Sequence, residues 1–136
     1  MQLSEKKVGI ISCRGEGCVE GTISRVATRL VLEKLPEKTV TICLPLFLAG
    51  GKEERAFARD YPTITVDGCE KLCAKIGTER YSGKPASSIV VTELARNWHC
   101  SKLNSRRKLD ADSVAVAEKV AERIAEEVDE VLDRWR

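Results

Sequence analysis

The chain has 136 residues, a length that fits one domain with its own hydrophobic core. Hydrophobic residues make up 43% and charged residues 32%, which is typical of a globular protein and excludes a disordered or collagen-like chain. The net charge of +2 does not favour nucleic acid, and no apolar run approaches the ~20 residues of a membrane span. Because the first residues are polar and carry no secretory segment, we expect one cytoplasmic domain over residues 1–136 with no membrane contact.

Apolar runs alternate with helical segments along most of the chain. In chain order, the pattern predicts a strand at 7–13, a helix at 19–35, a strand at 39–43, a helical turn at 52–59, a strand at 63–67, a short helix at 69–76 ended by Gly77, and a strand at 88–92. The strand runs are nearly continuous in apolar residues, as strands buried on both faces are. We therefore expect an α/β three-layer fold, with a flavodoxin-like four-stranded parallel sheet of order 2-1-3-4 and helices on both faces.

A long amphipathic helix is predicted over residues 110–136, with Asp110 or Asp112 as its N-cap. Arg123 and Glu127 are spaced to form an ion pair on its outer face. The helix is expected either to pack on the sheet or to bind a protein partner or a second copy of the chain. Its predicted apolar face consists of Val114, Ala117, Ala121, Ile124, Val128, Val131, Leu132 and Trp135.

Six cysteines are unusual for a cytoplasmic chain of this size, and they indicate metal or redox chemistry more than disulfides. Cys13, Cys43 and Cys69 each stand at or just after the end of a predicted strand, and the carboxyl ends of parallel strands share one edge. Cys73 follows Cys69 by four residues, so a helix there would put both on one face. Four such thiolates suit a tetrahedral Zn²⁺ or an iron–sulfur cluster. Cysteines that only pack in the interior are the alternative.

Three further residues could add to this set. Cys18 is an alternate ligand in place of Cys13, an additional ligand, or a free resolving thiol. His99 and Cys100 follow the fourth strand, where such a pair more often belongs to a loop. The glycines of residues 15–21 only loosely match a dinucleotide-binding loop, so we expect them to allow a tight turn beside the metal.

The run DGCEKLCAK, which contains Asp67-Gly68-Cys69 and Cys73, resembles the motif of the DGC family, small proteins that are named for this tripeptide and considered to bind zinc. The resemblance covers roughly residues 7–98, a cysteine-bearing core that leaves the helix at 110–136 outside. The first loop departs from the family pattern because it carries the extra Cys18. The resemblance implies zinc ligands at the four positions that the strand order also selects, Cys13, Cys43, Cys69 and Cys73.

The resemblance implies a metal and a fold, but no reaction. Four thiolates would close the coordination sphere of Zn²⁺, so we expect a metal-binding protein for storage, delivery, sensing or partner binding. Two alternatives stay open. One is a zinc-thiolate or cysteine-based enzyme of alkyl, persulfide or redox chemistry, and the other is an iron–sulfur protein.

Overall fold

A four-stranded parallel sheet with the order β2-β1-β3-β4 forms the middle layer of the protein. The computed structural model describes residues 6–13, 17–98 and 108–134. The strands are β1 (Val8–Ser12), β2 (Thr39–Thr41), β3 (Thr63–Asp67) and β4 (Ser87–Val90). The predicted strand order and the parallel direction are confirmed.

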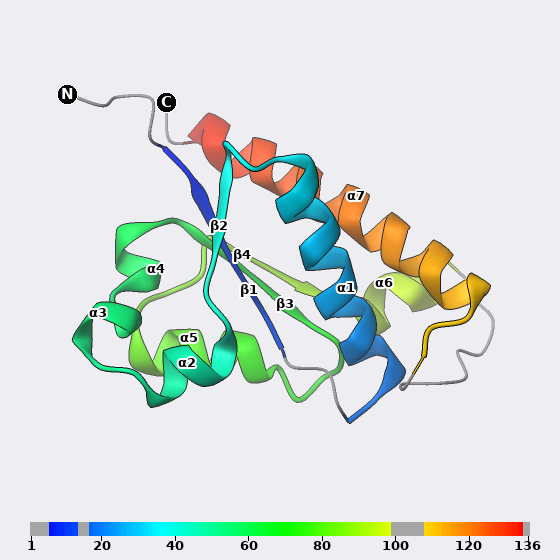
Figure 1. Cartoon of the computed structure of the whole chain (residues 1–136), viewed down its shortest axis with the longest axis horizontal. Helices are drawn as coiled ribbons and strands as arrows, with labels where there is room; N and C mark the ends of the chain where they lie inside the picture. Colours follow the sequence, from blue (N-terminus) through cyan, green and yellow to red (C-terminus); the bar gives the residue numbers. More distant parts are fainter. Residues whose placement is uncertain (1–5, 14–16, 99–107, 135–136) are drawn as a thin grey trace.

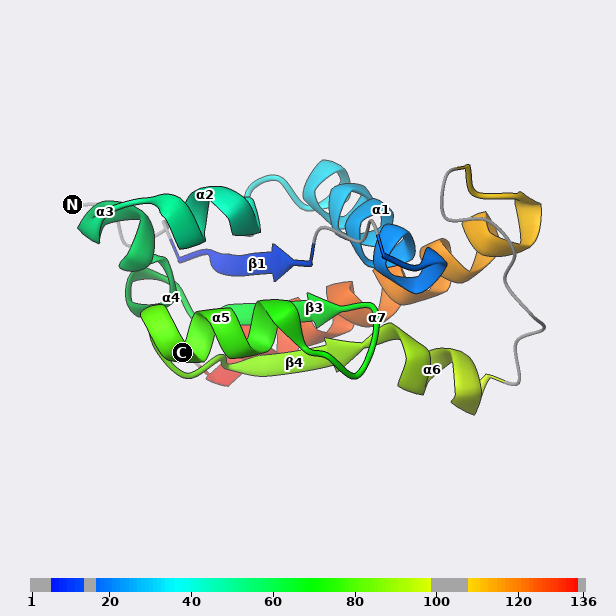
Figure 2. The same ribbon diagram turned by 90° about the horizontal axis from the view of Figure 1, so that it is seen from below.

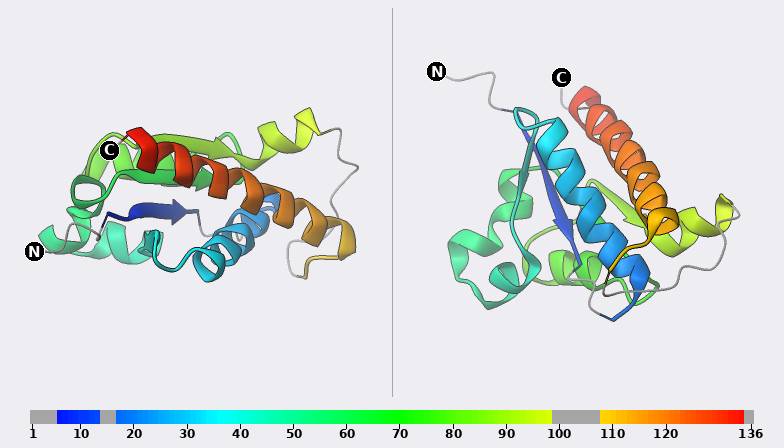
Figure 3. Two further views of the ribbon diagram at one scale, coloured as in Figure 1. Left: turned by 90° about the horizontal axis from the view of Figure 1, so that it is seen from above. Right: turned by 45° about the vertical axis from the view of Figure 1, so that its right-hand side comes forward.

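Helices cover both faces of this sheet (Figure 1). The two longest lie side by side on one face, as Figure 3 shows, and four shorter ones lie on the other, where Figure 2 places α5 in front of the sheet and α7 behind it. The helices are α1 (Val19–Lys34) and α7 (Ala111–Arg134) on the first face, α2 (Leu44–Ala49), α3 (Lys52–Arg55), α4 (Phe57–Asp60) and α5 (Cys73–Tyr81) on the second, and α6 (Val91–Asn97) after β4. The expected three-layer α/β fold is confirmed.

Alternate residues of β1 supply two separate hydrophobic clusters. Val8 and Ile10 belong to the larger cluster under α1 and α7, whereas Ile11 belongs to the smaller cluster under α2, α4 and α5. Gly9 makes room in the second layer, because a Cβ there would lie 2.5 Å from Cε1 of Phe57. The sheet therefore separates two cores of unequal size.

The fourth strand is shorter than predicted, since it ends at Val90 and not at Thr92. Val90 pairs with Asp67, the last residue of β3, so no strand backbone remains beyond it for pairing. Val91 instead begins α6 and is fully buried.

The short helix after β3 also begins later than predicted, at Cys73 and not at Cys69. The expectation that these two cysteines share one helical face is wrong, because Cys69 lies in the turn that precedes the helix. Gly77 lies inside the helix and does not end it. A Cβ at Gly77 would lie 3.3 Å from Cδ2 of Leu48, so the glycine allows α5 to pack closely on α2.

The predicted apolar face of α7 is largely confirmed, because Ala117, Ile124, Val128 and Val131 are buried and Ala121 and Leu132 pack against the core. The Asp110 carboxylate accepts a hydrogen bond from the Ser113 amide at 2.9 Å, which confirms Asp110 as the cap. Val114 is 41% exposed, whereas Val116 and Val120 lie in the core. Trp135, which was expected on the apolar face, lies outside the described residues. Neither α7 nor any other helix of the described ranges has the length and apolar character that crossing a membrane needs.

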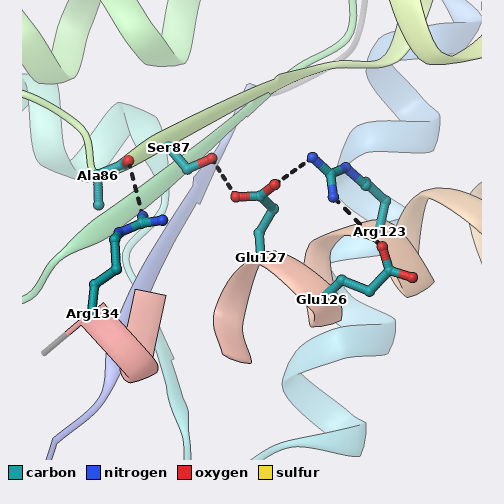
Figure 4. Close-up of polar contacts among 6 residues, drawn as sticks. All are labelled: Ala86, Ser87, Arg123, Glu126, Glu127 and Arg134. Carbon is teal, nitrogen blue, oxygen red and sulfur yellow. Dashed lines mark hydrogen bonds and ion pairs between the residues drawn. The ribbon is translucent and has the colours of Figure 1, made fainter. Parts of the chain in front are cut away.

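A buried carboxylate ties α7 to the start of β4 (Figure 4). The Ser87 hydroxyl donates a hydrogen bond to Glu127 Oε1 at 2.7 Å, and Arg123 pairs with the other oxygen. Glu127 is only 7% exposed. The ion pair between Arg123 and Glu127 was expected on the outer face of the helix, but its carboxylate is buried. Arg134 donates to the Ala86 carbonyl at 3.5 Å and adds a second link.

Candidate functional site

An open pocket of about 760 Å³ lies at the carboxyl ends of the strands. Segments that follow each of the four strands contribute to it, together with the first turn of α1. Four cysteines line it: Cys13, Cys18, Cys69 and Cys73. The remaining lining residues are Gly17, Glu20, Gly21, Leu44, Pro45, Leu48, Gly68, Glu70, Lys71 and Thr92.

Cys13 follows β1 and is held by hydrogen bonds to its sulfur. Its Sγ lies 3.2 Å from Ser24 Oγ, and the Gly68 amide donates to it at 3.3 Å. The Ser24 hydroxyl is itself fixed, because it donates to the Gly21 carbonyl at 2.6 Å. Burial raises the pKa of the Cys13 thiol above its ordinary value of 9.0, although the hydrogen bonds with Ser24 and Gly68 oppose the shift. In the metal-free protein Cys13 is therefore a neutral thiol at neutral pH.

Cys18 and Cys69 bring two thiols together at the N-terminus of α1. Cys18 is the N-cap residue, and its carbonyl accepts hydrogen bonds from the amides of Gly21 and Thr22 at 3.1 and 3.3 Å. Burial raises the pKa of the Cys18 thiol, the Gly21 amide lowers it, and the charge and the hydrogen bond of the Cys69 side chain raise it further. Both sulfurs border the same pocket, and both are half-buried free thiols.

Asp67, the first residue of the Asp-Gly-Cys motif, caps α5. Its carboxylate accepts hydrogen bonds from the amides of Ala74 at 2.7 Å and Lys75 at 3.0 Å, which belong to the first turn of the helix. Burial raises the pKa of the Asp67 carboxyl, whereas these amides and the Lys75 charge lower it. Leu72 has a φ of 55°, in the left-handed region, and turns the chain so that Cys73 becomes the first helical residue. Asp67 thus fixes where Cys73 stands.

Gly68, the second residue of the motif, lets the turn after β3 touch the backbone of α1. A Cβ there would lie 2.5 Å from Cα of Gly21 and 2.7 Å from the carbonyl carbon of Glu20. Side-chain atoms are essentially never this close to backbone, so the packing requires glycine at this position. The same close approach puts the next residue, Cys69, beside Cys18.

Cys43, the fourth predicted ligand, does not line this pocket. It is exposed and forms the N-cap of α2, directly before Leu44, which is part of the pocket wall. The other three predicted ligands and the alternate ligand Cys18 do line it. His99 and Cys100 lie outside the described residues.

Four of the five described thiols face a common pocket without forming a finished coordination shell. Within those ranges, no group of three or more histidine, cysteine, aspartate or glutamate side chains is arranged to hold a metal ion. The donor chemistry nevertheless fits one, because thiolates are preferred ligands of Zn²⁺ and of softer metals. All five described cysteines are free thiols that are half-buried or exposed, so rotation about χ1 can reorient their sulfurs.

The apolar wall of the pocket was not predicted from the sequence. It comes from α2, which supplies the buried Leu44 and the partly exposed Leu48. The available signal was the apolar run after Cys43 with Pro45 near its start, since proline is common in the first turn of a helix. Ser24, which positions Cys13, carried no signal of its own, because a single serine inside a helix has no distinctive pattern.

Comparison with known families gives one finding. A model of the DGC domain matches residues 9–128 of the chain. The match runs from β1 into α7, past the residues 7–98 that carry the resemblance in the sequence, and it includes every cysteine of the pocket. Comparisons with curated proteins and with solved structures gave no match.

Proposed function

The chain belongs to the DGC domain family, and on this basis we propose that it is a metal-binding protein that holds one Zn²⁺ through cysteine thiolates at the pocket. The observation that supports the proposal is the gathering of four thiols from separate chain segments around one open pocket. Cys13, Cys69 and Cys73 supply three ligands in this proposal. The fourth is Cys43, which the sequence selects, or Cys18, which already lines the pocket.

The setting of these thiols favours handling of the metal over catalysis by cysteine. A nucleophilic cysteine needs a lowered pKa, whereas burial raises the pKa of both Cys13 and Cys18. When bound, a divalent cation would compensate the charge of thiolates that repel one another without it. The exposed Cys43 and Cys73 can be reached from solvent, which suits transfer of metal to another molecule. Storage, delivery, sensing and partner binding are the uses consistent with such a site.

Metal content per chain is the first test. Protein is purified without oxygen and without added metal, and zinc, iron and sulfide are measured by mass spectrometry and chemical assay beside a count of reactive thiols. We expect about one zinc per chain and protection of about four thiols until a chelator is added. Detection of iron together with sulfide would indicate an iron–sulfur cluster in place of zinc. Six reactive thiols without any metal would contradict the proposal.

The fourth ligand is tested with a matched pair of variants, Cys18→Ser and Cys43→Ser. The variant that removes a ligand should lose about a hundredfold or more in zinc affinity, because even loss of an outer-shell contact costs 10–100-fold. The other variant should bind as the wild type does. Cys73→Ser is the positive control and should weaken zinc in either case. Equal wild-type affinity in both members of the pair would contradict four-thiolate coordination.

A further inference from the structure

The pocket is much larger than a metal ion needs. Its volume of about 760 Å³ lies within the 300–1,000 Å³ that is usual for pockets that bind small organic molecules. Leu44, Pro45 and Leu48 of α2 give it an apolar wall, and three glycines leave room beside the thiols. Four thiolates around one ion would use only the part of this space that the cysteines border.

The charges around the pocket select against anions. Glu20, Glu70 and Lys71 line it, which leaves one more negative than positive side chain. A phosphate or carboxylate group would meet repulsion here, whereas an uncharged molecule would not.

We propose that the pocket binds small uncharged organic molecules that carry a soft, thiol-seeking atom. Cys18 and Cys69 bind the soft atom in this proposal, since both line the pocket where the turn at Gly68 packs on the first turn of α1, and Leu44 and Leu48 contact the organic part. The close packing of Gly68 on α1 holds the two thiols together before any ligand arrives. The inference rests on the thiol site of the proposed function, but it does not depend on zinc.

Organic arsenic(III) hydrates are suitable probes, because they react with two thiols without oxidation or reduction. Two As–S bonds form, two As–O bonds break, and the two thiol protons leave with the hydroxyl groups as two molecules of water. Methylarsonous and phenylarsonous acid share this chemistry and differ only in the organic group. The difference between them therefore measures the apolar wall, and the methyl compound alone measures the thiol pair.

The experiment titrates both probes into the reduced, metal-free full-length chain in competition with dithiothreitol, so that affinities are expressed relative to a simple dithiol. We expect the phenyl compound to gain at least about tenfold over the methyl compound, as burial of several apolar carbons would give. Cys18→Ser should weaken both probes. Equal relative affinities of the two probes would overturn the inference, as would an unchanged affinity in Cys18→Ser.

A matched pair of variants on α2 isolates the wall. Leu48→Asp should remove most of the phenyl gain and leave methyl binding unchanged, and Leu48→Ala provides the same test in milder form if the aspartate variant does not fold. Leu46→Asp is the control, because Leu46 is 50% exposed on the same helix and does not line the pocket. If the phenyl compound still binds more tightly than the methyl compound in Leu48→Asp, the proposed apolar wall is contradicted. Zinc binding measured in parallel separates the two proposals: if zinc binds and the phenyl gain is absent, only this inference fails.

Discussion

A methyl group at Gly68 would collide with the backbone of α1. In Gly68→Ala the new Cβ would lie 2.5 Å from Cα of Gly21, where ordinary contact begins at 3.4 Å. Backbone atoms cannot rotate away, so the turn after β3 must shift by about 1 Å. Overpacking of this kind costs roughly 1–3 kcal/mol, and we expect about 2 kcal/mol. For a domain of this size, that corresponds to a fall in Tm of about 8 °C.

The same shift should disturb the thiol site. Cys69 directly follows Gly68, so its sulfur would move away from that of Cys18. Binding sites generally need their ligands held within about 0.5 Å of the productive position. A displacement of about 1 Å should therefore weaken zinc binding by tenfold or more, in addition to the loss of stability.

Urea unfolding followed by circular dichroism measures the stability of Gly68→Ala, and chelator competition measures its zinc affinity. Gly17→Ala is the matched control, because Gly17 lines the same pocket and a Cβ there would have nothing within 4 Å. It should change the free energy of unfolding by less than about 0.5 kcal/mol. If Gly68→Ala unfolds at the same urea concentration as the wild type, the proposed packing of the motif against α1 is refuted.

Three further outcomes follow from the contacts described. Burial raises the pKa of Asp67 above its value in the unfolded chain, so its ionised form costs stability that is regained as pH falls toward 3.8. The free energy of unfolding of the wild type, measured in urea, should therefore rise relative to that of Asp67→Asn as the pH falls from 7 to about 4. A difference that stays constant with pH would contradict the raised pKa. Because the Cys13 thiol is protonated at neutral pH, zinc must displace its proton, and that of Cys18 as well if Cys18 is the fourth ligand. Zinc affinity should rise about tenfold per pH unit for each proton released, as chelator competition at several pH values would show, whereas a flat profile would indicate preformed thiolates. Glu127→Ala should cost about 2 kcal/mol in urea unfolding and Ser87→Ala less, with zinc binding unchanged in both, because a charged hydrogen-bond acceptor contributes more than a neutral donor. Equal stability of the two variants would argue against the buried Glu127 carboxylate as the main link between α7 and β4.

The sheet could be predicted from the sequence because its signals are local. Thr63–Val66 is a continuous β-branched run followed by Asp67, and the structure gives the strand the predicted bounds, Thr63–Asp67. Cys13 ends one such run, so the parallel order alone placed it at the edge where the pocket lies. Each of these inferences needed only a short stretch of chain and the general rules of parallel sheets.

The remaining features depend on contacts between distant residues. The start of α5 is set by the Asp67 carboxylate acting across the intervening turn, and the 69–76 segment alone does not contain that information. The buried face of α7 depends on Ser87 of β4, which offers Glu127 a partner and draws a charged residue inward. Periodicity treats every glutamate as a surface residue, so it could not indicate that Glu127 is buried. Tertiary partners of this kind are not visible in a single sequence.

The two unequal cores make the pocket a junction between parts of different stability. Cys18 begins α1, which packs with α7 in the larger cluster, whereas Cys73 precedes Ala74, which lies in the smaller one. An ion held by both would act as a cross-link between them, and its binding free energy would add to the cohesion of the weaker part. Without the ion, we expect α2 and α5 on the smaller core to open locally more readily than α1 and α7 on the larger one. Occupancy of the pocket would thus convert two semi-independent units into one cooperative domain, and amide exchange in α5 would slow accordingly.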